Sequence, residues 1–316
     1  MASELGPFVL AFAAGVVCAG VGGELFVRGV AGVTTRLRVP AALVGVTLAA
    51  FATSAPELSV AVQASLAGQP AIALGDALGS NIVNLGLVLG LTLVIAGTTV
   101  PRRTISRDYS LALGSPLLIG GLLIDGHLGR ADGLLLIGVF VAWIAFVTAD
   151  ALRHRRESEP DEMHGWSAWI AVGFGLAGVI VLVIAGRLIV DGAGGITVAL
   201  GMPEFVVGAV VVAIGTSTPE LATSLIAKIR GHHDLSLGNV LGSNIFNCML
   251  IVGVVAAISG ITVPMTEVLL ALGFGLGTTL LCFPRGAGYL GRGRGVLLVL
   301  AYVVYVALSL SRPGGH

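Results

Sequence analysis

Hydrophobic and polar positions along the chain form long blocks rather than a residue-by-residue alternation. An α-helix needs about 20 apolar residues to cross the hydrocarbon core of a bilayer. Because the apolar runs are continuous, without the alternation of a membrane β-barrel, the pattern predicts an all-α integral membrane protein. We predict ten transmembrane helices, at 6–29, 41–66, 71–97, 109–125, 131–150, 167–191, 204–229, 235–259, 265–284 and 295–311.

The amino-acid composition agrees with this pattern. Hydrophobic residues make up 56% of the 316 residues and charged residues only 11%, whereas soluble domains carry about 25% charged residues. The chain therefore cannot cover itself with a polar surface, and we expect the lipid bilayer to surround it. The sequence indicates no nucleic-acid partner and no resident cofactor, and it does not predict an oligomeric state.

The basic residues predict the orientation of the spans. All of the 17 Lys and Arg residues except Arg130, Arg187 and Arg312 fall in or beside the odd-numbered loops. Cytoplasmic loops of membrane proteins are enriched in Lys and Arg, so the odd-numbered loops should be cytoplasmic. We therefore expect a multi-pass protein of the cell (cytoplasmic) membrane with both termini extracytoplasmic.

The sequence also contains an internal repeat. A shift of 163 residues aligns 44–90 with 207–253 without a gap, and 20 of these 47 positions are identical. Five spans in each half is an odd number, so the second half should enter the membrane in the opposite direction. Inverted repeats of this kind are typical of secondary transporters. We predict two inverted-topology five-helix repeats, 1–150 and 167–316, joined by a cytoplasmic linker at 151–166.

Two matching motifs place an acid deep inside a predicted span. "ATSAPEL" (52–58) contains Glu57, and "GTSTPEL" (215–221) contains Glu220. An ionised side chain at this depth costs several kcal/mol unless it is compensated. No Lys, Arg or His lies deep within a predicted span. We therefore expect the compensating charge to come from a transported cation that both glutamates bind as metal ligands.

The residues around these acids are oxygen donors. Thr53 and Ser54 share a helix face with Glu57, and Pro56 leaves the carbonyl of Ala52 without its usual donor and distorts the helix. The second motif repeats the arrangement with Thr216, Ser217 and Pro219. Carboxylate, hydroxyl and carbonyl oxygens are the ligands of Ca²⁺, and they suit Na⁺ equally well.

The next helix of each half adds further polar residues, in "GDALGSNIVN" (75–84) and "GNVLGSNIFN" (238–247). Helical spacing places Ser80 beside Asn84 and Ser243 beside Asn247. Asn81 and Asn244 point about 100° away and are expected to brace neighbouring backbone.

Asp76 is a third acid, and its repeat counterpart is Asn239. Because it lies near the outer end of its span, we interpret it first as a charge at a helix end and second as a possible outer ion ligand.

The whole chain resembles the cation/calcium exchanger superfamily, and most closely its prokaryotic sodium/calcium exchangers. The resemblance is carried by the ten spans, the inverted halves, "ATSAPE" with "GTSTPE", and "GSNIVN" with "GSNIFN". It implies transport of Ca²⁺ and Na⁺, with spans one and six sliding across a rigid core. It also implies a central cluster of ion-binding residues: Ala50, Thr53, Ser54, Glu57, Ser80 and Asn84 from one half, and Ala213, Thr216, Ser217, Glu220, Ser243 and Asn247 from the other.

The chain departs from the family pattern at two positions. Ala52 stands where the family usually has Gly, and Asn247 stands where many sodium/calcium exchangers have Asp. With fewer acids, a proton-coupled cation antiporter of the same fold stays open as an alternative to Ca²⁺/Na⁺ antiport by alternating access. A passive cation channel is a further alternative. An intramembrane protease is not expected, because no base accompanies a serine deep in the membrane and no second Asp pairs with Asp76.

Overall fold

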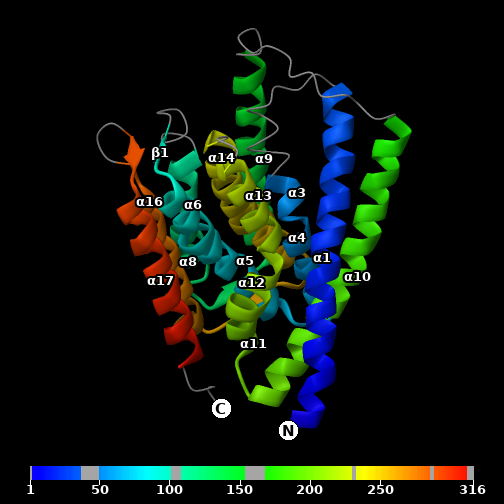
Figure 1. Cartoon of the computed structure of the whole chain (residues 1–316). Coiled ribbons are helices and arrows are strands. Elements are labelled where there is room, and N and C mark those ends of the chain that lie inside the picture. Colours follow the sequence, from blue (N-terminus) through cyan, green and yellow to red (C-terminus); the bar gives the residue numbers. More distant parts are fainter. Residues whose placement is uncertain are drawn as a thin grey trace.

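The computed structural model describes residues 2–36, 50–100, 108–153, 168–229, 233–284 and 288–311, which fold into a bundle of helices (Figure 1). Its first half contains α1 (Ala2–Arg36), α3 (Ala50–Thr53), α4 (Ala55–Leu66), α5 (Pro70–Ile82), the π-helical segment η2 (Val83–Leu89), α6 (Gly90–Ile95), α8 (Ser110–Leu122) and α9 (Arg130–Arg153). Two short strands, β1 (Thr98–Thr99) and β2 (His127–Leu128), separate the last of these helices.

The second half follows the same order of elements from residue 213 onward. It contains α10 (Ala168–Leu200), α11 (Glu204–Val206), the π-helical segment η5 (Val207–Val212), α12 (Ala213–Thr216), α13 (Thr218–Ile229), α14 (His233–Ile245), the π-helical segment η6 (Phe246–Ile251), α15 (Val252–Ser259), β3 (Ile261–Thr262), α16 (Met265–Cys282), β4 (Tyr289–Leu290) and α17 (Arg292–Leu310). The strands pair antiparallel between the halves, β1 with β4 and β2 with β3.

The protein is a helical membrane protein by the length and apolarity of its helices. Seven helices in the described ranges are long and apolar enough to span a bilayer, and the number rises to eight if Glu204–Thr216 and Thr218–Ile229, which are bent by 43°, count as one span. The span predicted at 109–125 corresponds to α8, which is a shorter apolar helix. The first part of the span predicted at 41–66 lies outside the described residues, and so does most of the linker predicted at 151–166.

The core of the bundle lies around two of these spans. In the most apolar stretches of Pro70–Ile95 and Ser236–Ser259, 78% of the residues are buried, whereas the share is 17–39% in the other long spans. Their backbones approach neighbouring helices closely where glycine removes the side chain. A Cβ on Gly75 would lie 2.2 Å from the carbonyl oxygen of Phe205, and one on Gly79 would lie 2.2 Å from that of Ala209.

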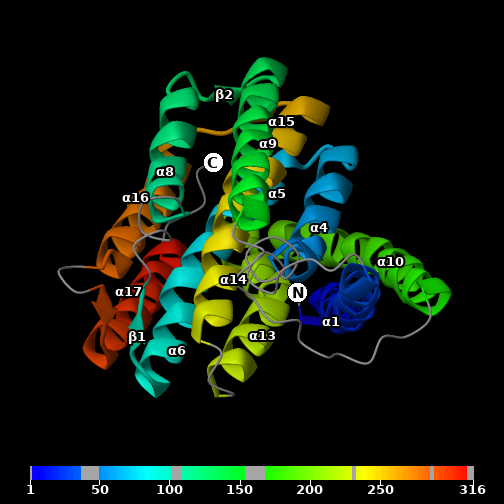
Figure 2. The ribbon, with the colours of Figure 1, turned by 90° about the horizontal axis from the view of Figure 1, so that it is seen from above.

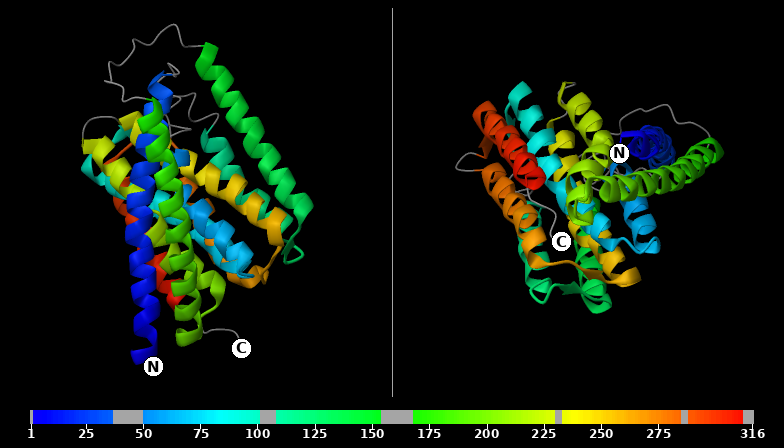
Figure 3. Two further views of the ribbon diagram at one scale, coloured as in Figure 1. Left: turned by 90° about the vertical axis from the view of Figure 1, so that its right-hand side faces the viewer. Right: turned by 90° about the horizontal axis from the view of Figure 1, so that it is seen from below.

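Helices α1 and α10 form a separate pair at one side of the bundle, as Figures 2 and 3 show. They run antiparallel, since Gly15 packs against Ile189 and Gly29 packs against Gly175. We refer to them below as the α1–α10 pair. Small residues at a helix interface let backbones approach, which is how membrane helices gain packing energy without a hydrophobic driving force.

Candidate functional site

The helix that carries each predicted motif is interrupted within the motif at a single residue. Ser54 separates α3 from α4, and Ser217 separates α12 from α13. Proline is tolerated in the first turn of a helix, because the amide hydrogens there have no partner within the helix and its missing one costs nothing. Pro56 and Pro219 both lie in that turn. Each helix break thus lies two residues before a proline.

The same break places both glutamates in the first turn of a helix, Glu57 in α4 and Glu220 in α13. The positive end of the helix dipole favours an anion at this position. Both side chains are nevertheless fully buried, at 0% exposure. In each glutamate one carboxylate oxygen, Oε2, has no hydrogen-bond partner.

The serines of the motifs bond across the interface between the halves. Ser54 Oγ donates to Glu220 Oε1 at 2.9 Å, and Ser217 Oγ donates to Glu57 Oε1 at 3.3 Å. Ser243 Oγ also donates to Glu220 Oε1, at 3.3 Å. Each glutamate is thus held by a hydroxyl of the opposite half, so the two motifs form one cluster.

The threonines reach the next helix of the opposite half. Thr53 Oγ1 donates to Asn239 Oδ1 at 3.1 Å, and Thr216 Oγ1 donates to Asp76 Oδ1 at 2.9 Å. Ser80 Oγ lies 3.3 Å from the same Asp76 oxygen. The carboxylate of Asp76 therefore belongs to the cluster.

Our first interpretation of Asp76 as a charge at a helix end is wrong. Asp76 lies in the middle of α5 with 0% exposure, because Gly208 brings η5 so close that a Cβ there would lie 3.0 Å from the Asp76 amide nitrogen. Sequence reasoning also missed Asn239. Both residues precede the predicted serines by one helical turn, which was the available signal.

The remaining predicted side chains, Asn84 and Asn247, lie in the π-helical segments η2 and η6. Both are fully buried, and neither their amide nitrogen nor their amide oxygen has a hydrogen-bond partner. Single π-helical turns in membrane and soluble helices often occur at functional sites. The amides of Asn84 and Asn247 are thus buried in the core without hydrogen bonds, including any to the carboxylates of the cluster.

The predicted backbone ligands lie one turn before the helix breaks. The carbonyl oxygen of Ala50 accepts from the Ser54 amide at 2.9 Å, and that of Ala213 accepts from the Ser217 amide at 3.1 Å. Each carbonyl oxygen also accepts a longer bond from a threonine hydroxyl, from Thr53 Oγ1 to Ala50 at 3.3 Å and from Thr216 Oγ1 to Ala213 at 3.5 Å.

Asn81 and Asn244 brace backbone as predicted. Asn81 Nδ2 donates to the carbonyl oxygen of Asn244 at 3.1 Å, and Asn244 Nδ2 donates to that of Asn81 at 3.2 Å. This reciprocal pair joins α5 to α14, the two helices that carry the second set of polar residues.

None of the three carboxylates forms an ion pair with Lys, Arg or His within the described ranges. The same ranges contain no group of three His, Cys, Asp or Glu side chains that could hold a metal ion by themselves. Any cation in this cluster would therefore be bound by carboxylates together with hydroxyl, amide and backbone oxygens.

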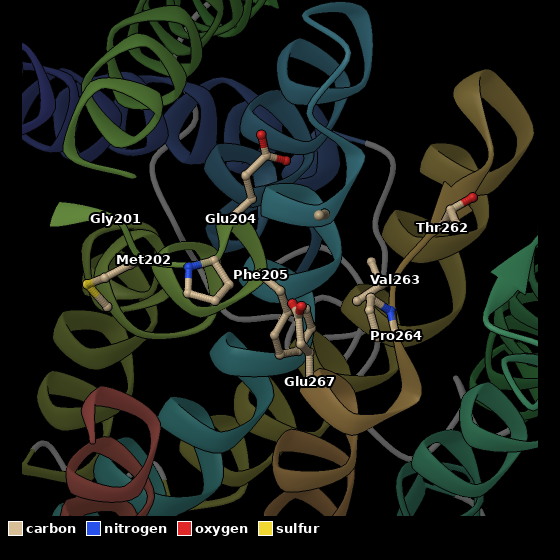
Figure 4. A pocket seen from close by; sticks show the side chains of 10 residues that line it. Gly201, Met202, Glu204, Phe205, Thr262, Val263, Pro264 and Glu267 are labelled. Atoms are coloured by element: carbon tan, nitrogen blue, oxygen red, sulfur yellow. The ribbon is translucent and has the colours of Figure 1, made fainter. Parts of the chain in front are cut away.

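A pocket of about 290 Å³ is lined mainly by the segment before α11, the first residues of α11 and the segment that joins β3 to α16 (Figure 4). It contains two acids, Glu204 and Glu267. Phe205 lines this pocket, and its carbonyl oxygen packs against Gly75, the residue before Asp76. A single contact between α11 and α5 thus separates the pocket from the helix that carries Asp76.

A bundle of apolar helices around fully buried acids without basic partners defines a membrane transporter for cations. The family described as "Sodium/calcium exchanger protein" matches this chain twice, over residues 7–149 and 169–311. The chain belongs to this family, whose members are exchangers rather than enzymes.

Individual relatives agree with this assignment. The chain is 37% identical over 240 residues to "Putative antiporter CaxA" of Alkalimonas amylolytica, which covers 73% of this chain and 74% of the relative. It is 33% identical over 285 residues to "Inner membrane protein YrbG" of Escherichia coli, covering 85% and 86%. A solved structure of the sodium-calcium exchanger NCX_Mj, soaked with Na⁺ and Sr²⁺, superposes with a TM-score of 0.68 at 28% identity, covering 96% of this chain and 99% of the other.

Proposed function

We propose that the protein is a secondary antiporter that exchanges Ca²⁺ for Na⁺ across the cytoplasmic membrane. The observation that carries this proposal is the crossed pair of fully buried glutamates, Glu57 and Glu220, each with one unpartnered oxygen. Burying an unpaired charge in a medium of low dielectric costs far more than a hydrogen bond returns. The two negative charges of these glutamates balance the charge of one Ca²⁺ or of two Na⁺.

The surrounding oxygens complete the proposed ion site. Ca²⁺ takes six to eight oxygen ligands, which the two glutamates alone cannot supply. We assign the other ligands to the hydroxyls, amides and carbonyls of Ala50, Thr53, Ser54, Ser80, Asn84, Ala213, Thr216, Ser217, Ser243 and Asn247.

The proposed architecture is ten spans in two inverted-topology repeats. The recurrence of the same elements at an offset of 163 residues supports it, for example α4 with α13 and α5 with α14. So do the two separate matches of one family to the two halves. With both termini extracytoplasmic, the pocket lined by Glu204 and Glu267 opens to the outside.

Alternating access in this proposal is a movement of the α1–α10 pair across the rest of the bundle. The close glycine contacts within the pair favour its movement as one body. The cluster carries uncompensated negative charge when it is empty, and moving that charge past apolar helices is unfavourable. The pair therefore moves readily only when bound ions neutralise most of this charge, which couples the two fluxes.

Transport by reconstituted protein tests the proposal. Proteoliposomes loaded with Na⁺ and diluted into Na⁺-free buffer should accumulate radiolabelled Ca²⁺. Glu57→Gln and Glu220→Gln remove one charge each while preserving shape, and each should lower the initial uptake rate more than 100-fold. The estimate follows from the loss of one of two charges at a site with an effective dielectric constant of about 20, which is worth several kcal/mol.

Ser65→Ala is the matched control, because Ser65 is a buried polar residue of the same helix that bonds only to the carbonyl oxygen of Ala61. This variant should retain uptake. Na⁺-driven Ca²⁺ uptake that persisted in both glutamine variants would refute the assignment of the glutamates.

Proton coupling is the alternative antiport. Two buried glutamates can also carry protons in membrane transporters. Calcium uptake driven by a pH gradient in Na⁺-free buffers would establish it, whereas calcium flux without any opposing ion gradient would indicate a channel.

A further inference from the structure

Among the acidic, amide and hydroxyl side chains placed in the cluster above, the two halves differ at one position. Thr53, Ser54, Glu57, Ser80 and Asn84 have the same residue type 163 positions later, in Thr216, Ser217, Glu220, Ser243 and Asn247. The exception is Asp76, whose counterpart is Asn239. Asp76 therefore adds to one half a negative charge that the other half lacks.

The neutral counterpart is satisfied by the protein itself. Asn239 Nδ2 donates to Ser224 Oγ at 3.1 Å, while its Oδ1 accepts from Thr53 Oγ1 at 3.1 Å. Both ends of the amide thus have a partner, so this position requires no ligand.

Asp76 is not satisfied in this way. Its Oδ1 accepts from Thr216 Oγ1 and Ser80 Oγ, but its Oδ2 is buried without a partner. The residue in the place of Ser224 is Ala61, which has no hydroxyl. The first half has thus replaced a self-satisfied amide and hydroxyl with a carboxylate and a methyl group, and the resulting buried free oxygen calls for a positively charged partner.

We infer that Asp76 is the third acidic ligand of the ion site and binds a Na⁺ of its own together with the hydroxyls of Thr216 and Ser80. This inference rests on the proposed function. The hydroxyls can turn their lone pairs to the ion, because Thr216 Oγ1 also lies 3.2 Å from the carbonyl oxygen of Val212, which can accept its proton. A single carboxylate supplies the charge that a monovalent cation requires.

The third acid changes the charge balance of the exchange. Glu57 and Glu220 alone would balance one Ca²⁺ against two Na⁺, and that exchange would move no net charge. With Asp76 occupied by a further Na⁺ in the sodium-loaded state, one more Na⁺ crosses for each Ca²⁺. The exchange then moves net positive charge with Na⁺, so an imposed membrane potential drives it.

The test is the double variant Ala61→Ser/Asp76→Asn, which rebuilds in the first half the Ser224–Asn239 arrangement of the second. Asp76→Asn alone would leave a buried amide hydrogen without an acceptor, so the added serine protects the fold. Ala61→Ser alone keeps the carboxylate and adds the same hydroxyl, so it is the reference that separates the effect of the serine from that of losing Asp76. Two quantities are measured for each protein: radiolabelled Na⁺ bound per chain at saturation in detergent, and the dependence of Ca²⁺ uptake on a potential set with K⁺ and valinomycin.

We expect the double variant to bind one Na⁺ fewer per chain and to exchange Ca²⁺ independently of the potential. An unchanged Na⁺ count would overturn the role of Asp76, as would unchanged voltage dependence in a variant that still transports. If the double variant is inactive, the Na⁺ count alone decides between these results. A wild-type protein without Na⁺-driven Ca²⁺ uptake would instead refute the proposed function, and the Na⁺ count would still show whether Asp76 binds the ion.

Discussion

Replacing Gly79 with alanine should separate the helices that support the ion site. A Cβ on Gly79 would lie 2.2 Å from the carbonyl oxygen of Ala209 and 2.6 Å from its Cα. Both are backbone atoms, so no change of rotamer can relieve the clash. To restore an ordinary contact of 3.4 Å, α5 and η5 must move apart by about 1.2 Å along the line to the carbonyl oxygen.

This displacement has a predictable cost. Overpacking a well-packed interior costs about 1–3 kcal/mol. The movement also reaches Asp76 and Ser80 of α5, whose side-chain oxygens lie 2.9 Å and 3.5 Å from Thr216 Oγ1 in the helix that follows η5. A shift of about 1 Å takes both distances beyond hydrogen bonding. We therefore expect Gly79→Ala to lower the thermal unfolding midpoint in detergent by several degrees and the initial rate of Ca²⁺ uptake about tenfold or more.

Gly114→Ala provides the matched control. A Cβ on Gly114, in α8, meets no atom within 4 Å, and alanine is the better helix former. This variant should unfold at the wild-type temperature or slightly above it, and it should transport normally. The packing argument would be refuted by a Gly79→Ala protein that matched Gly114→Ala in both measurements.

Two further changes test other parts of the structure. Asn81→Ala removes the donors to the Asn244 carbonyl oxygen and to Cys248 Sγ. Each interhelical bond in a membrane protein is worth roughly 0.6 kcal/mol, so the free energy of unfolding measured by denaturant titration should fall by about 1 kcal/mol. An unchanged free energy of unfolding would contradict the bracing role. The double variant Glu204→Gln/Glu267→Gln removes negative charge from the pocket. Its KM for extracytoplasmic Ca²⁺ should be a few-fold higher than that of the wild type at low ionic strength and equal to it at high salt. Equal KM values at low salt would refute the idea that these acids attract Ca²⁺ to the pocket.

Much of the fold could be predicted from the sequence because the energy of placing a residue in lipid depends mainly on the residue itself. The apolar runs predicted the long helices to within a few residues in several cases, such as 131–150 against Arg130–Asp150 and 265–284 against Met265–Cys282. The motifs also predicted that Glu57 and Glu220 lie deep inside the protein, and both are fully buried. Membership of the exchanger family followed from the same motifs.

The contacts inside the site could not be predicted in this way. Ser54 and Glu57 share a motif, yet Ser54 bonds to Glu220, which is 166 residues away. The partner of each hydroxyl depends on how the two halves dock, and a repeat within one chain carries no information about the angle or register of that docking.

Asp76 shows most clearly what the tertiary structure decided. Its position along the chain, six residues after the start of α5 at Pro70, indicated an exposed helix end. The glycines of α5 and η5 instead allow the two backbones to touch, and the Asp76 carboxylate is fully buried, with a hydrogen bond from Thr216 of the opposite half. The sequence by itself determined which acids lie within the apolar helices, whereas the close packing of helices from opposite halves determined which of them face the same site.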